Sequence, residues 1–129
     1  MRIEHVAVWT RDLERLRGFY ERYFGARAGE RYENAATGFA SYFLELESGA
    51  RLELMQMASV PDSRDDPLAQ FTGLVHVAVS VGSTAAVDEL AERLRADGHR
   101  VVGEPRWTGD GYYESVVLDP DGNRIELTS

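Results

Sequence analysis

The feature that most constrains the fold of this chain is an internal repeat. A shift of 71 residues places LVHVAV (74–79) on IEHVAV (3–8), so a histidine leads the same apolar pattern twice. Stacked repeat proteins need at least three units of roughly 20–50 residues, whereas this repeat is longer and occurs only twice. The sequence therefore predicts two similar modules related by pseudo-symmetry.

A helix is expected after each of these strands. Apolar residues recur at helical spacing in DLERLRGFYERYFG (12–25) and TAAVDELAERLRADG (84–98). The candidate N-caps are Thr10 or Asp12 and Ser83 or Thr84, and the candidate terminating glycines are Gly25 and Gly98. Because start and stop signals agree with the periodicity, both helices are predicted with defined ends.

Each module then returns to extended structure. SYFLELESGARLELMQM (41–57) is typical of two strands joined by a turn at Ser48-Gly49, and YYESVVLDPDGNRIELTS (112–129) of two strands joined at Asp119-Pro120-Asp121-Gly122. Residues 27–32 and 99–106 are each predicted to add one strand. The repeated unit is therefore β-α-β-β-β.

These patterns predict an α+β fold with one domain over residues 1–129. Two paired βαβββ modules, about 1–58 and 74–129, are expected to be joined by a linker at 59–73 that is rich in proline and aspartate. Their curved sheets are expected to enclose one cavity. A length of 129 residues with 43% hydrophobic content suits one such domain.

Composition excludes several classes of function. The formal net charge of −8 disfavours nucleic acid and anionic membrane surfaces as partners. The absence of cysteine removes disulfides, thiolate metal sites and cysteine nucleophiles. The sequence has no apolar run long enough to span a bilayer, and its start lacks the apolar region of a signal peptide, so a cytoplasmic protein is expected.

Four residues at matched positions suggest a metal site. Each module supplies one histidine and, on its last strand, one glutamate: His5 with Glu53, and His76 with Glu126. Strand alternation places each glutamate opposite the apolar residues that face a helix. A half-buried carboxylate needs a partner, and a divalent cation between two imidazoles and two carboxylates would supply one. Any one of these residues alone would more often be structural or solvated.

Three segments carry a resemblance to a known family. They are IEHVAVWTRDLERLRGFYERYFG (3–25), GLVHVAVSV (73–81) and LDPDGNRIEL (118–127). The chain resembles the vicinal oxygen chelate superfamily of glyoxalases, bleomycin resistance proteins and dioxygenases, and most of all its small bacterial glyoxalase I-like lyases. The resemblance implies that His5, Glu53, His76 and Glu126 hold one divalent ion per site, one of Ni, Co, Mn, Mg or Zn. It also implies a homodimer.

The resemblance implies a metal-dependent lyase or isomerase, like lactoylglutathione lyase. Such an enzyme would remove a proton from a small substrate with vicinal oxygens, through a metal-bound enediolate. Glu126 is then the leading candidate for the base, and Glu53 is the alternative. The glutathione-dependent lyases usually continue the first glutamate strand with threonine and asparagine, whereas Met55-Gln56-Met57 stands here. This difference argues against glutathione specificity.

Two other functions of the same fold remain open. One is a small-molecule binding or drug-resistance protein without turnover, in which ligand affinity would persist after chelation of the metal. The other is a dioxygenase, which is less favoured because four protein ligands leave fewer metal positions for both substrate and oxygen.

Overall fold

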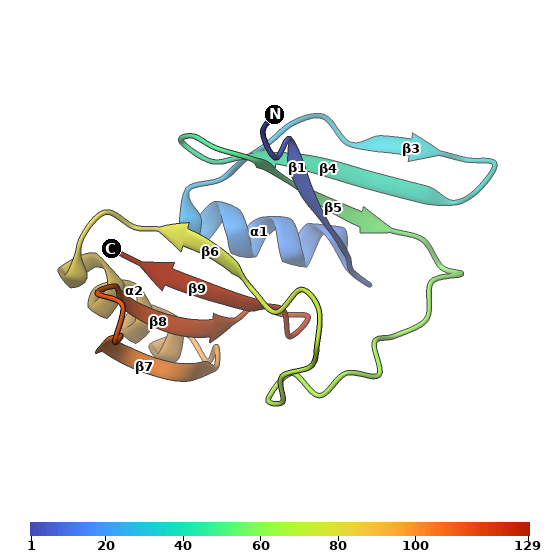
Figure 1. Ribbon diagram of the computed structural model, residues 1–129. Helices are drawn as coiled ribbons and strands as arrows, with labels where there is room; N and C mark the ends of the chain where they lie inside the picture. Colours follow the sequence, from blue (N-terminus) through green and yellow to red (C-terminus); the bar gives the residue numbers. More distant parts are fainter. The chain divides into compact units, whose positions relative to one another are not determined.

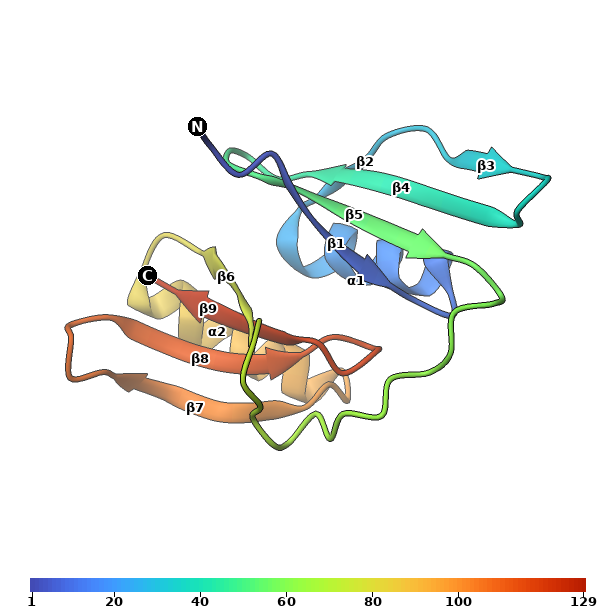
Figure 2. The same cartoon turned by 45° about the vertical axis from the view of Figure 1, so that its right-hand side comes forward.

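The computed structural model describes all residues from Met1 to Ser129. It divides into two compact units, unit 1 (residues 1–63) and unit 2 (residues 64–129). In each unit one helix covers one face of a sheet, as Figures 1 and 2 show. The α+β class predicted from the sequence is confirmed. No helix has the length and apolar character required to cross a membrane.

Unit 1 has a mixed sheet with the strand order β1-β5-β4-β2, and β3 pairs with the other part of β4. Its elements are β1 (His5–Trp9), α1 (Leu13–Phe24), β2 (Arg27–Ala28), β3 (Tyr32–Asn34), β4 (Phe39–Glu45) and β5 (Arg51–Gln56). Strands β1 and β5 are parallel, although they are the first and last of the unit. The single strand expected at 27–32 is therefore wrong, since two short strands, β2 and β3, take its place.

The interruption between β2 and β3 has a local cause. The N–H of Gly29 still donates to the carbonyl of Phe43 at 2.9 Å, so the chain follows β4 up to that point. Gly29 and Glu30 then leave the sheet, and both residue types have low strand propensity. Pairing with β4 resumes only at Tyr32.

Unit 2 repeats the topology, with the strand order β6-β9-β8-β7 and a parallel β6–β9 pair. Its elements are β6 (Val77–Ser80), α2 (Thr84–Ala96), β7 (Val101–Trp107), β8 (Tyr113–Leu118) and β9 (Arg124–Thr128). The strand expected at 99–106 is confirmed as β7, which begins two residues later and ends one residue later, and β7 carries two register irregularities against β8. The sequence repeat is thus a structural repeat.

Both helices begin at one of the predicted caps. The Asp12 carboxylate accepts a hydrogen bond from the backbone N–H three residues later at 3.0 Å, and the Ser83 hydroxyl does the same at 3.1 Å. Gly25 ends α1 in the left-handed conformation with φ of 62°, and Gly98 follows α2 with φ of 89°.

Each helix packs its apolar side chains on one face of its sheet, so the opposite face is the one left for a functional site. The buried helix residues are Leu13, Leu16, Phe19, Tyr20 and Tyr23 in α1, and Val87, Ala91 and Leu94 in α2. Leu54 of β5 and Leu127 of β9 are fully buried on the sheets that these helices cover. Because strand side chains alternate, the residues before them, Glu53 and Glu126, lie on the opposite face.

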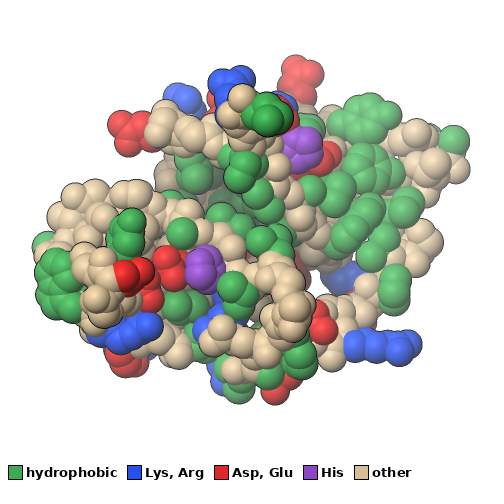
Figure 3. Space-filling view, in the orientation of Figure 1, with side chains coloured by type: hydrophobic (Ala, Val, Ile, Leu, Met, Phe, Trp, Pro, Cys, Tyr) green, Lys and Arg blue, Asp and Glu red, His purple; other side chains and the backbone are tan.

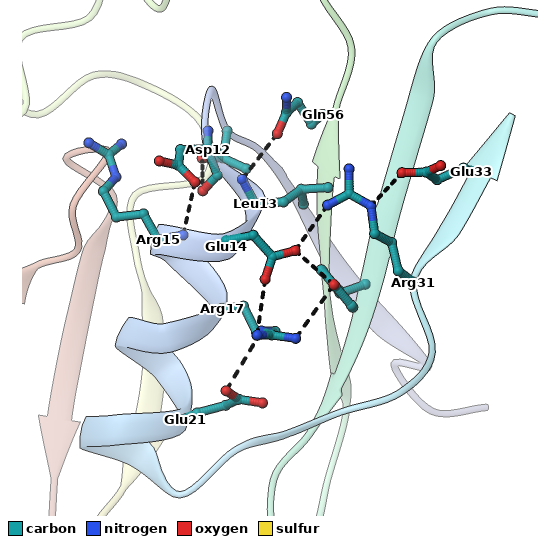
Figure 4. A network of polar contacts seen from close by, with 11 residues as sticks. Asp12, Leu13, Glu14, Arg15, Arg17, Glu21, Arg31, Glu33 and Gln56 are labelled. Atoms are coloured by element: carbon teal, nitrogen blue, oxygen red, sulfur yellow. Dashed lines mark hydrogen bonds and ion pairs between the residues drawn. The ribbon is translucent and has the colours of Figure 1, made fainter. Parts of the chain in front are cut away.

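A polar network joins α1 to β4 at the edge of the unit 1 core (Figure 4). The buried ring of Tyr42 lies beneath the guanidinium of Arg17 at 5.1 Å and near that of Arg31 at 5.9 Å. Its hydroxyl donates to Glu14 at 2.8 Å. Glu14 also forms ion pairs with both arginines at 3.0 Å.

Candidate metal centre

The first predicted pair comes together on neighbouring parallel strands. Ala7 of β1 is opposite Glu53 of β5, which places His5, two residues earlier, on the same face as Glu53. The distance from Nε2 of His5 to Oε2 of Glu53 is 3.6 Å. The glutamate side chain is mostly buried, with 15% exposure, and the imidazole is 39% exposed. Unit 1 therefore presents one imidazole and one carboxylate toward the same point.

The second predicted pair has the same arrangement in unit 2. Ala78 of β6 is opposite Glu126 of β9, and Nε2 of His76 lies 3.6 Å from Oε2 of Glu126. The exposed fractions, 37% and 17%, are close to those of the first pair. In the space-filling view, histidine side chains lie beside acidic ones on the visible surface (Figure 3). Neither unit gathers three or more His, Asp or Glu side chains into a metal cluster of its own.

The β8–β9 turn helps to set the position of Glu126. The buried Asp119 carboxylate accepts hydrogen bonds from the N–H groups of Asp121 and Asn123, both at 2.9 Å. Gly122 occupies the turn with φ of 85°, a conformation that favours glycine. This DPDGN turn fixes the start of β9 and hence the strand that carries the glutamate.

The donor atoms of each pair fit one divalent cation. Two ligands held about 2.1 Å from one ion at angles of 90–110° lie about 3.0–3.4 Å apart. The observed 3.6 Å separations are within a few tenths of an ångström of that range. Imidazole nitrogen and carboxylate oxygen are also donors typical of first-row divalent ions. Each pair thus has the chemistry and spacing of two metal ligands.

The surroundings of Glu126 favour its protonated form when no cation is present. Burial raises the pKa of the Glu126 carboxyl, the nearby His76 opposes this rise, and Glu114 of β8 adds to it through its charge and a hydrogen bond. Glu114 in turn forms an ion pair with Arg106 of β7 at 3.1 Å. Sequence reasoning did not select Glu114, although it is two residues from Val116, the cross-strand partner of Glu126.

Glu4 lies beside His5, and sequence reasoning did not select it either. Nδ1 of His5 forms a hydrogen bond with the carboxylate of Glu4, and the same carboxylate pairs with Arg51. The His5 ring meets Phe43 edge to face, with ring centroids 5.4 Å apart. The only sequence signal was the acidic residue next to the histidine, because the positions of Arg51 and Phe43 depend on strand register.

Gln56, at the end of β5, has a structural role. Its side-chain oxygen accepts a hydrogen bond from the backbone N–H of Leu13 at 3.1 Å, at the first turn of α1. One of the orphan N–H groups of the helix start is satisfied in this way. The side-chain oxygen of Gln56 is thus engaged within unit 1.

Comparison with known proteins places the chain in a family. The profile of the glyoxalase/bleomycin resistance protein/dioxygenase superfamily matches residues 2–127. The chain belongs to this superfamily. Its two units, each a mixed sheet covered by one helix, accordingly form a glyoxalase-like fold.

Relatives within the superfamily include enzymes. The mitochondrial methylmalonyl-CoA epimerase of Bos taurus is 33% identical over 71% of this chain and 54% of its own length. Lactoylglutathione lyase GLX1 of Arabidopsis thaliana is 30% identical over 98% of this chain and 43% of its own length. The chain therefore spans about half the length of these two relatives.

Solved structures of the superfamily show the same fold. The trypanothione-dependent glyoxalase I of Leishmania major matches with a TM-score of 0.79 and 25% identity, over 100% of this chain and 86% of that one.

Proposed function

We propose that this protein is a metal-dependent lyase or isomerase of the glyoxalase I type that acts on a small substrate with vicinal oxygen atoms. The observation that carries the proposal is the equality of the two His–Glu pairs. Both have a 3.6 Å separation between Nε2 and Oε2, and both occupy the same register of a parallel strand pair. Structural needs alone would not require the same two residue types at both places.

In this proposal, residues 1–129 form one domain and the protein is a homodimer, and each metal site takes its two His–Glu pairs either from one chain or from both chains of the dimer. His5, Glu53, His76 and Glu126 hold one divalent ion, one of Ni, Co, Mn, Mg or Zn. When bound, the ion supplies Lewis-acid polarisation of a substrate carbonyl.

The protein's own residues carry the proton. Glu126 takes the proton from the carbon next to the polarised carbonyl and returns it to the neighbouring carbon, and Glu53 is the alternative base. The preference for Glu126 comes from the family resemblance. The side-chain oxygen of Gln56 already accepts the Leu13 N–H, so it is less available to hold a glutathione tripeptide.

Metal content tests the first part of the proposal. We expect elemental mass spectrometry of gently purified protein to find about one divalent ion per chain, and the double variant His5→Ala/Glu126→Gln to lose it. Glu89→Gln on the outer face of α2 is the matched control and retains the ion. A wild-type chain that takes up none of Ni, Co, Mn or Zn would refute the metal site.

Proton exchange tests the second part. Small 2-oxo and 2-hydroxy compounds, including the hemithioacetal of methylglyoxal, are incubated with the metal-loaded protein in deuterated water and followed by NMR. We expect exchange at the carbon next to the carbonyl, lost in Glu126→Gln and retained in Glu53→Gln reloaded with metal. Ligand binding without any exchange would instead indicate a binding protein, and oxygen uptake with a catechol would indicate a dioxygenase.

A further inference from the structure

The two ring nitrogens of His5 have different partners. Nδ1 is within hydrogen-bond distance of the Glu4 carboxylate, whereas Nε2 lies 3.6 Å from Glu53, beyond the length of a hydrogen bond. A carboxylate only accepts hydrogen bonds, so the proton of the neutral imidazole lies on Nδ1. The lone pair of Nε2 is then directed to the side where Glu53 lies.

Glu4 is itself held in place from three directions. One carboxylate oxygen contacts His5 and the other pairs with the guanidinium of Arg51. The backbone N–H of Arg51 also donates to the Glu4 carbonyl at 3.0 Å. The Arg51 guanidinium lies 4.2 Å above the ring of Phe43, and the same ring meets His5 edge to face. The four side chains therefore form a closed set of contacts around His5.

Unit 2 has no counterpart of this set. The position equivalent to Glu4 is Val75, and the cross-strand partner of Glu126 is Val116 where the partner of Glu53 is Phe43. Arg124 is equivalent to Arg51, but its guanidinium donates to the carbonyl of Pro67 at 3.3 Å. The side chain of His76 has a polar contact with Glu126, at 3.6 Å, and no carboxylate on its Nδ1.

We propose that Glu4 is a positioning residue, locked by Arg51, that fixes the Nδ1–H tautomer and the ring orientation of His5. A histidine ligand whose second nitrogen donates to a carboxylate binds metal through the correct tautomer and with higher basicity. The imidazole of His5 is then held in one tautomer and one orientation, whereas the imidazole of His76 can change both. The effect of the Glu4 contact on metal affinity rests on the proposed function, whereas the tautomer of His5 is a property of the metal-free protein.

The tautomer is measured directly in the metal-free protein. Nitrogen-15 NMR at a pH of about 8.5, where an ordinary histidine is neutral, reports which ring nitrogen carries the proton. We expect His5 to have its proton on Nδ1 and His76 to populate both tautomers. In Glu4→Ala the His5 signals become like those of His76, while Glu4→Gln keeps the wild-type pattern because its amide oxygen also accepts. Val75→Ala, at the equivalent position of unit 2, changes neither histidine.

Zinc titration then measures how much the contact between Glu4 and His5 contributes to Zn²⁺ affinity. We expect Glu4→Ala to bind Zn²⁺ about 10–100-fold more weakly than the wild type, and Val75→Ala to stay within about twofold. A wild-type His5 with its proton on Nε2, or a tautomer unchanged by Glu4→Ala, would overturn the proposal. Zinc binding that is insensitive to His5→Ala would refute the metal role of His5 instead, and the NMR result would still decide the role of Glu4.

Discussion

Replacement of Tyr42 by phenylalanine tests whether the network between α1 and β4 stabilises unit 1 through the hydrogen bonds of the Tyr42 hydroxyl or through packing of its ring. The substitution keeps the buried ring and the two guanidinium groups near it. It removes the 2.8 Å hydrogen bond to Glu14 and the longer one, 3.5 Å, that the Arg17 guanidinium donates to the hydroxyl. Glu14 keeps its two arginine partners and is 51% exposed, so no buried group loses its last partner. We therefore expect a loss of about 0.5–1.5 kcal/mol in the free energy of unfolding.

Urea unfolding at pH 7 measures this loss, and two further variants bracket it. Tyr42→Ala removes the ring and should cost about 3–5 kcal/mol. Tyr112→Phe, at a largely exposed tyrosine, should cost close to nothing. A cost for Tyr42→Phe as large as that for Tyr42→Ala would refute the reasoning, because the hydroxyl would then carry the energy assigned to packing.

The same variant has a predicted pH dependence. The Tyr42 hydroxyl is the largest cause that holds the pKa of Glu14 below its ordinary value, with Arg17 and Arg31 adding to it. A carboxyl pKa that is lower in the folded state gives stability above the unfolded pKa, and this stability is lost as the pH falls through the folded pKa. The difference between wild type and Tyr42→Phe should therefore shrink in acid. NMR titration should show the Glu14 pKa moving up toward its ordinary value in the variant, and an unmoved pKa would contradict the assignment.

Three further predictions concern individual residues. Asp12→Ala removes the N-cap of α1 and should lower the free energy of unfolding by about 1 kcal/mol in urea, whereas Asp12→Ser should restore most of it. Gly103→Ala would place a new Cβ 3.2 Å from the Val116 Cβ, so it should lower the free energy of unfolding in urea by about 1–3 kcal/mol. An unchanged free energy of unfolding would show that β7 can shift at its irregular register without cost. The hydroxyl of Tyr113 donates to Asp88 at 2.8 Å, which raises the pKa of the phenol; ultraviolet titration should show that Asp88→Asn lowers it, and equal curves would contradict the bond.

Local patterns were enough to predict most of the fold. The helix starts at Asp12 and Ser83 follow from capping chemistry within four residues, and the strands of Glu53 and Glu126 follow from a period of two. The break at Gly29 was missed because a single glycine in an extended segment is compatible with either a continuous strand or an interruption.

The neighbours of the candidate ligands were harder to predict. Arg51 reaches Glu4 because β1 lies parallel to β5, and Glu114 reaches Glu126 because β8 pairs with β9 in one particular register. Such register depends on the packing of whole sheets, so no short sequence pattern encodes it. The matched His–Glu positions were visible only because the repeat supplied a second copy for comparison.

The parallel pairing of β1 with β5, and of β6 with β9, also constrains the order of folding. In each unit the first strand pairs with the last, so the histidine and its glutamate become neighbours only when the chain between them has folded back on itself. Contacts between such distant residues form late, because closing a long loop costs entropy before any contact is gained. A nascent chain therefore cannot assemble either His–Glu pair until the last strand of that unit, β5 or β9, has been synthesised.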